Sequence, residues 1–185
     1  MPLFRRSLTL PLLAALVASA CWWTRSSPPS PEEGALTDAQ IAAVVIAANN
    51  ADIAFADLAL AVSQDADVRA FALMVKKDHE SVNEEAGKLL TRLGVTPQGS
   101  ELSFDLRDDA DTKRLMLRDL EGAAFDSAYA DNELRYHRSV LTAMDDVLIP
   151  AATNAEFKAL LVAVRPAVAA HLEHSRALAT KKSQR

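Results

Sequence analysis

Glycine and cysteine are both scarce in this 185-residue chain. It contains 5 glycines, and none of them forms the Asn-Gly or Asp-Gly pair that predicts a β-hairpin. No segment alternates β-branched and polar residues as a half-buried strand does. Alanine-rich segments with apolar residues three and four positions apart are present instead, which is the spacing of helices. The sequence therefore predicts an all-α protein, and its single cysteine, Cys21, excludes an internal disulfide.

A surplus of basic charge is also absent, because 20 Lys and Arg residues face 25 Asp and Glu residues and give a formal net charge of -5. This acidic balance argues against a nucleic-acid partner. The chain has no G-x-S-x-G motif for a serine nucleophile and no glycine-rich loop for phosphate. These absences favour a role without catalysis, although they do not decide whether the protein is an enzyme.

The first residues have the pattern of a secretory signal peptide. A short basic start is followed by the apolar stretch 8–17, then by small residues and Cys21. The string VASAC resembles a bacterial lipobox, so we expect a signal segment 1–21 and a lipid on Cys21; cleavage near Ala20 with an unmodified Cys21 is the alternative. The Ser/Pro-rich segment 22–36 is a tether. The predicted location is the periplasm or the outer membrane or cell surface, with the lipid attaching the protein to a membrane.

The rest of the chain has the periodicity of a helical bundle, expected over 37–180 with a frayed end at 181–185. Capping residues and Gly94 mark the ends of the expected helices. The first helix is expected from Thr37 to about Ser63, and the second, capped by Asp65 or Asp67, ends at Leu93. A long irregular segment 95–108 follows. The third helix is expected from about Asp109 to Leu148, with a break or kink at Gly122, and the fourth starts at Thr153 or Asn154.

Each expected helix has an ionisable residue on its apolar stripe, at Asp52, His79, His137 and His171. In an up-down bundle, Asp52 and His79 would lie within about 5 Å of the same height, counted from the turn that joins their helices. The corresponding difference for His137 and His171 is about 9 Å. The spacing therefore predicts that polar side chains from four helices approach one another in the core.

Three strings carry a resemblance to a known family: FALMVKKDHESV, AAFDSAYADNELRYH and PAVAAHLEHSRAL. Their motifs are an Asp-His pair at 78–79, Phe-Asp-x-x-Tyr at 125–129 with His137, and Pro166 followed by His171-Leu172. The sequence resembles a family of exported bacterial proteins called domain of unknown function 4142. The resemblance implies a ferritin-like up-down four-helix bundle over nearly all of 37–180, with a long loop between its second and third helices. Family members often have Glu where this chain has Asp52.

One hypothesis for the polar positions is a metal centre. Imidazole and carboxylate together suit Zn, Fe, Cu or Ni. The candidate ligands are Asp52, His79, His137 and His171, and the candidate partners that would orient them are Asp78, Asp126, Tyr129 and Glu133. A ferroxidase centre is not expected, because the residues three positions before the histidines are Lys76, Leu134 and Val168 rather than glutamates.

Two other hypotheses stay open. The same side chains could form a buried hydrogen-bonded network that fixes how the helices pack, and its histidines would respond to external pH. The domain could instead be a scaffold in the envelope, where a bundle face or the segment 95–108 binds another protein or a second copy.

Overall fold

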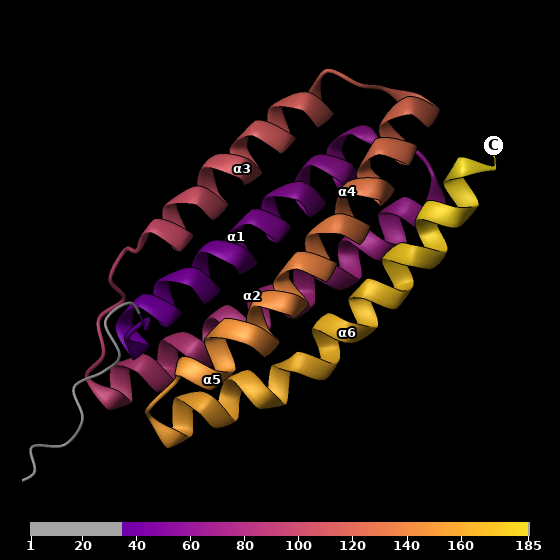
Figure 1. Cartoon of the computed structure of the whole chain (residues 1–185). Coiled ribbons are helices and arrows are strands. Elements are labelled where there is room, and N and C mark those ends of the chain that lie inside the picture. Colours follow the sequence, from indigo (N-terminus) through magenta and orange to yellow (C-terminus); the bar gives the residue numbers. More distant parts are fainter. Residues whose placement is uncertain (1–34, 185) are drawn as a thin grey trace, which may run out of the picture. The chain divides into compact units, whose positions relative to one another are not determined.

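The computed structural model describes residues 35–184, and every regular element in this range is a helix. The all-α prediction is therefore confirmed. The signal segment, Cys21 and nearly all of the tether lie outside the described residues. The helices, shown in Figure 1, are α1 (Asp38–Val62), α2 (Ala66–Leu93), α3 (Glu101–Arg118), α4 (Gly122–Ala143), the π-helix η1 (Met144–Leu148), α5 (Ile149–Ala151) and α6 (Ala155–Ser183).

Local capping chemistry sets most helix ends where the sequence predicts them. Thr37 and Gln40 form a reciprocal capping box at the start of α1. Asp65 accepts from two backbone amides at the start of α2, and Asn154 does the same for α6. Gly94 ends α2 with a φ of 66°, a left-handed conformation that favours glycine.

The prediction of a long irregular segment at 95–108 is wrong. Only residues 95–100 are irregular. Ser100 caps α3 in a reciprocal pair with Ser103, and the helix that follows runs through most of the expected loop. The expected third helix begins earlier than Asp109, and the break expected at Gly122 is confirmed: α3 ends at Arg118, and Gly122 begins α4 with a φ of 56°.

Helix α1 lies at the centre of the fold and contacts α2, α3 and α4 (Figure 1). Helix α6 packs against α4 and α2, and α3 lies on the outside, mainly over α1. Among the described residues, α1 is also the one helix long and apolar enough to cross a membrane by length and composition, with half of that window buried inside the protein. A helix that is apolar nearly all round is expected at the centre of a core, so this finding is weak support for a membrane span.

Two apolar clusters form the core, and the polar residues lie between them along the helices. On α2, the first cluster contains Val68 to Val75, the second contains Leu89 and Leu90, and His79 lies between. On α4 and α6, His137 and His171 likewise separate residues of one cluster from residues of the other. The fold therefore places the three histidines in one polar layer, with apolar packing on both sides.

Residues 181–183, part of the expected frayed end, continue α6. The side chain of Lys182 is only 3% exposed, and its Nζ lies 2.5 Å from Oδ1 of Asp65 at the start of α2. The neighbouring Lys181 pairs with Asp67, but both of those side chains remain exposed. The end of α6 is therefore attached to the turn between α1 and α2.

We expect Lys182→Met to destabilise the domain by about 2 kcal/mol, because removing one partner leaves the other charge poorly compensated in a buried site. The matched Lys181→Met should cost less than about 1 kcal/mol, since exposed ion pairs contribute little. Urea unfolding gives the free energy of unfolding of both variants, and equal losses would contradict a stabilising role for the buried pair of Lys182 and Asp65.

The same ion pair predicts a pH dependence. The contact with Lys182 lowers the pKa of the Asp65 carboxyl from 3.8 to about 2, although burial opposes the shift. A depressed carboxyl pKa stabilises the folded state above the unfolded value and loses this contribution as the pH falls through about 2. Urea unfolding should therefore show an Asp65→Asn variant that is less stable than wild type at pH 7 and approaches it between pH 4 and pH 2.

Candidate metal centre

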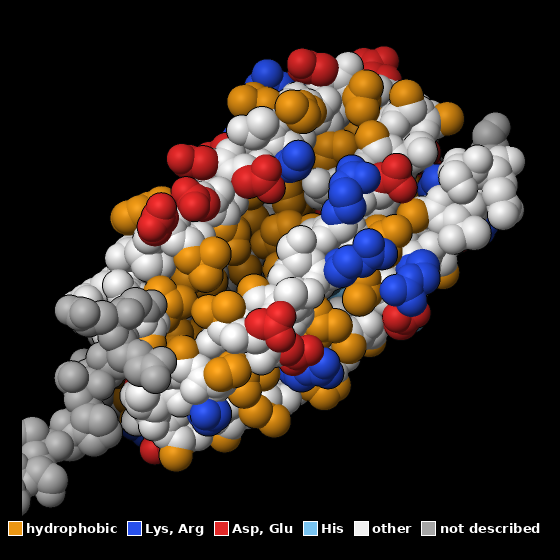
Figure 2. All heavy atoms as spheres, viewed as in Figure 1, with side chains coloured by type: hydrophobic (Ala, Val, Ile, Leu, Met, Phe, Trp, Pro, Cys, Tyr) orange, Lys and Arg blue, Asp and Glu red, His pale blue; other side chains and the backbone are white. Residues whose placement is uncertain are grey.

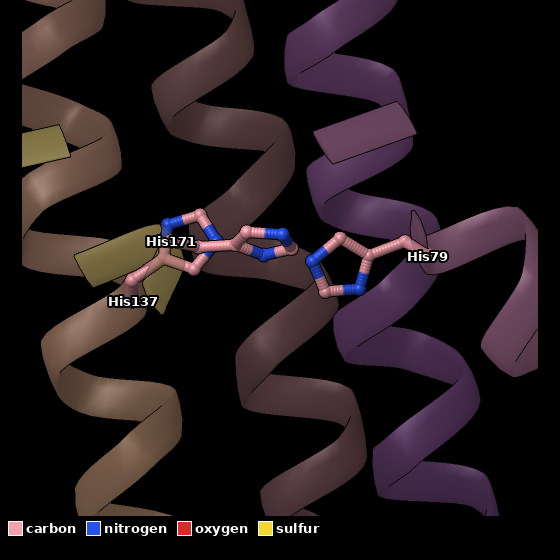
Figure 3. Close-up of side chains that lie close together, drawn as sticks. All are labelled: His79, His137 and His171. Atoms are coloured by element: carbon pink, nitrogen blue, oxygen red, sulfur yellow. The ribbon is translucent and has the colours of Figure 1, made fainter. Parts of the chain in front are cut away.

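Three histidine rings from three helices meet inside the bundle. His79 comes from α2, His137 from α4 and His171 from α6, and their rings point into the same space (Figure 3). Their ring centroids are 5.2 to 6.0 Å apart. All three side chains are buried, and each ring offers a nitrogen that lies within 4.8 Å of those of the other two.

One nitrogen of each ring is held on its outer side by an oxygen acceptor. Nδ1 of His137 lies 3.0 Å from the backbone carbonyl of Glu133, and Nε2 of His171 lies 2.9 Å from Oδ2 of Asp78. Nδ1 of His79 lies 2.8 Å from Oδ1 of Asn49, whose amide nitrogen donates to Asn83. Because these acceptors require an N–H, the geometry fixes the tautomer of each neutral ring.

The remaining nitrogen of each ring is buried and has no hydrogen-bond partner among the described residues. These atoms are Nε2 of His79, Nε2 of His137 and Nδ1 of His171. The outer contacts leave each of them with a lone pair in the neutral ring. Buried polar atoms are rarely left without partners in folded proteins, so three of them facing one space indicate a missing positive group.

Asp52 of α1 brings a carboxylate into this space. Its side chain is fully buried, and Oδ2 lies 2.8 Å from Nε2 of His79 and 3.1 Å from Nε2 of His137. These distances are short, yet neither contact has the geometry of a hydrogen bond. Lone pairs on neutral rings would repel a carboxylate at this separation. Positive charge at this point would remove the repulsion, and it could come from protons on the rings or from a metal ion bound between the ligands.

The pKa of the Asp52 carboxyl also depends on positive charge beside it. Burial raises the pKa of the Asp52 carboxyl, but the charges and contacts of His137 and His79 outweigh burial and hold that pKa well below its usual range. The carboxyl is thus ionised when positive charge stands beside it. A bound cation would favour the ionised form for the same Coulombic reason.

Glu133 lies next to Asp52 and behaves in the opposite way. Burial, together with the negative charge of Asp52, raises the pKa of the Glu133 carboxyl well above its ordinary value. Glu133 Oε2 is 3.5 Å from Nδ1 of His137, and Asp52, Glu133 and His137 form a second set of potential ligand atoms within 4.8 Å of one another. The hydroxyl of Tyr129 is buried without a hydrogen-bond partner one turn earlier on α4. A neutral Glu133 can hydrogen-bond to Asp52, and an ionised one could be a further ligand.

Burial lowers the pKa of His171 below its ordinary value, and the contact with Asp78 opposes this shift. The side chain of Asp78 is partly exposed, so it connects the buried layer to the surface between α2 and α6. A neutral His171 ring is the form that binds a metal ion through its lone pair.

The structure thus brings together Asp52, His79, His137 and His171, the four residues that the sequence indicated as candidate ligands. Of the candidate partners, Asp78 and Glu133 contact the histidines. Asp126 does not, because its Oδ1 accepts from Ser63 at the end of α1. Sequence reasoning missed Asn49; it lies three residues before Asp52, and this helical spacing on one face is the signal that could have indicated it.

A family model described as domain of unknown function (DUF4142) matches residues 24–178, which is most of the chain. The chain belongs to the DUF4142 family. No curated protein and no solved structure matches the sequence. The family resemblance seen in the sequence is therefore confirmed. Because the family is defined by a domain of unknown function, the role of this DUF4142 protein has to be argued from the polar layer itself.

Proposed function

We propose that this DUF4142 protein is a metal-binding bundle of the bacterial cell envelope, in which His79, His137, His171 and Asp52 hold one transition-metal ion. The proposal rests on the different surroundings of the two nitrogens in each histidine ring. Each ring gives its outer nitrogen to a protein oxygen and leaves its inner nitrogen without a partner. Metal-binding histidines show this pattern, because the outer hydrogen bond fixes the ring and its tautomer.

The distances around Asp52 also suit ligands of one ion. Bonds of about 2.0–2.1 Å from zinc to nitrogen or oxygen place neighbouring ligand atoms of a tetrahedral site about 3.3 Å apart. The contacts of Asp52 with His79 and His137, at 2.8 and 3.1 Å, are close to this separation. Three imidazoles with one carboxylate suit Zn, Fe, Cu or Ni, and the ligand types do not choose among them.

The envelope location rests on the sequence alone. We propose that the signal segment 1–21 exports the chain, that a lipid on Cys21 anchors it, and that the tether 22–36 holds the domain away from the membrane. We also propose that α1, α2, α4 and α6 correspond to the four helices of a ferritin-like bundle. Their mutual contacts around the polar layer support this assignment. In this setting the domain would bind or buffer a metal ion and so contribute to stress tolerance.

Calorimetric titration of the processed, chelator-treated chain with Zn(II) tests the proposal. We expect one binding site per chain, lost in His79→Ala and retained in His174→Ala, because His174 is an exposed histidine one turn beyond His171. A binding curve that is equal in the two variants would reject the site.

The outer hydrogen bonds provide a finer prediction. Asn49→Ala should weaken metal affinity by roughly 10- to 100-fold, because such orienting partners typically contribute this much. Asn50→Ala, at the neighbouring position on α1, should change it little, since Asn50 accepts from Asn83 and does not contact a histidine. The ratio of the dissociation constants from the same titration is the measurement, and an unchanged affinity in Asn49→Ala would show that the outer contact does not orient a ligand.

A second candidate function is binding of a protein partner or a second copy. A surface groove of about 390 Å³ runs between α3 and α4, and Figure 2 shows apolar side chains on its floor with charged residues along its edges. Leu102 and Leu106 of α3 face Tyr136 and Val140 of α4 in its lining. Sedimentation velocity over a range of concentrations tests self-association, and a monomer throughout would contradict the homo-oligomeric form.

A further inference from the structure

A small apolar cavity adjoins the histidine layer on one side. It has a volume of about 50 Å³ and is lined by residues of α1, α2, α4, η1 and α6. Its polar lining residues are His79, His171, Asn49 and Asp78. The rest of the wall is aliphatic and includes Leu161 and Val164 of α6.

Local features of the helices account for this space. The side chains that line it on α1 and α6 include Ala48 and Ala167, which are too small to fill the gap that a leucine would occupy. Helix η1 is a π-turn, and both of its end residues, Met144 and Leu148, line the cavity. Such π-turns widen a helix locally and occur frequently at functional sites.

We propose that this cavity binds a small, uncharged molecule of a few heavy atoms directly against the rings of His79 and His171, so that neutral small molecules are the ligand class of the metal centre. The link to a metal rests on the proposed function, whereas the cavity itself does not. Ten of the fourteen lining residues are aliphatic, which favours an uncharged ligand over an ion, because a charge placed among them would lose its hydration without a partner. The volume excludes larger ligands, since an apolar cavity that holds benzene measures about 150 Å³.

The opening of the cavity is consistent with this assignment. Asp78 and Ala167 both line the cavity and are partly exposed. Asp78 is also the residue that holds the outer nitrogen of His171. A neutral molecule entering between α2 and α6 would therefore pass one carboxylate and then meet mainly aliphatic side chains, the two rings and the amide of Asn49. Anions would be repelled at the same place.

Xenon is a suitable probe, because it is uncharged and enters dry apolar cavities. Crystals of the metal-free processed chain, pressurised with xenon, should show a xenon atom between the side chains of Leu161 and Val164 and the rings of His79 and His171. In solution, the ¹²⁹Xe chemical shift should change saturably with protein concentration. Ala167→Leu should abolish both signals. Ala163→Leu, an exposed position one turn earlier on α6 that does not line the cavity, should leave both unchanged.

Failure of the cavity and failure of the metal centre are distinguishable. No xenon at this position in wild-type crystals, or equal binding in the Ala167→Leu and Ala163→Leu variants, would overturn the cavity assignment whether or not the protein binds metal. The width of the ¹²⁹Xe resonance, measured once with Co(II) and once with Zn(II) bound to the protein, tests whether the cavity lies beside the metal. Broadening by paramagnetic Co(II) alone is expected, and identical lines for the two metals would overturn the claim that the ligand lies beside the centre. The absence of metal binding by titration would instead reject the proposed function.

Discussion

Removal of the metal by a chelator is expected to lower the melting temperature of the processed chain by about 5–10 °C. A ligand that binds only the folded state at 100 times its dissociation constant contributes about 2.7 kcal/mol. For a domain of this size, 1 kcal/mol corresponds to roughly 2–4 °C. The ion would also satisfy the unpartnered nitrogens of His79, His137 and His171, which lie in the middle of the core. Differential scanning calorimetry with and without Zn(II) gives the shift.

The stabilisation should depend on the histidines and on pH. In a double variant, His79→Ala with His171→Ala, added metal should shift the melting temperature by less than about 1 °C, while His174→Ala should keep the full shift. Protons compete with the metal for the same lone pairs, so the shift should be smaller in acidic buffer than at neutral pH. A shift of equal size in the double variant would mean that the ion binds elsewhere.

Asp52→Ala is expected to have the largest effect on the stability of the metal-free protein, about 3–5 kcal/mol. Asp52 is fully buried and is in contact with both His79 and His137. Its removal would take away the nearest polar contact of two buried ring nitrogens, Nε2 of His79 and Nε2 of His137, which is costly. It would also leave a small cavity on α1. Urea unfolding at pH 7 in the presence of a chelator measures the loss.

A matched control lies on the same helix. Asp57 is more than half exposed and pairs with Lys76, so Asp57→Ala should cost less than about 1 kcal/mol. The variant Asp52→Asn keeps the volume of the side chain and separates the loss of charge from the loss of packing. If Asp52→Ala were as mild as Asp57→Ala, the polar layer would not depend on its buried carboxylate.

The sequence predicted most helix ends because capping is local. Thr37, Asp65, Gly94 and Asn154 act through atoms within a few residues, and the structure uses each of them as expected. The start of α3 was missed although Ser100 is also a local cap. This helix is strongly charged and lies on the outside of the fold, and only Ser103, Ala110 and Leu117 are buried, so few large apolar residues mark it in the sequence.

The candidate site was predictable where a polar residue interrupts an apolar stripe. That pattern selected Asp52, His79, His137 and His171, which the fold brings together. The expected 9 Å height difference between His137 and His171 was too large. The helical path after His137 continues through η1 and α5 to Ala151 rather than ending at Leu148, which makes the two arms more equal in length. The ring centroids accordingly lie 5.2 Å apart.

The outer partners and the cavity could not be obtained from spacing. Asn49 is one of several polar residues on α1, and only the register between α1 and α2 directs its oxygen to His79. The cavity depends on which small side chains from separate helices face one another, and on a π-turn that no local motif in the sequence marks. Both features follow from tertiary packing rather than from local propensity.

Elemental analysis of the processed chain, purified without an affinity tag, tests the central claim most directly. The account predicts close to one equivalent of a transition metal per chain in the wild type and a near-complete loss in the variant that combines His79→Ala with His137→Ala. A wild-type protein that contains no metal, and that takes up none after incubation with Zn, Cu, Fe and Ni, would contradict it. The three histidines would then belong to a buried polar network around Asp52 that fixes how the helices pack.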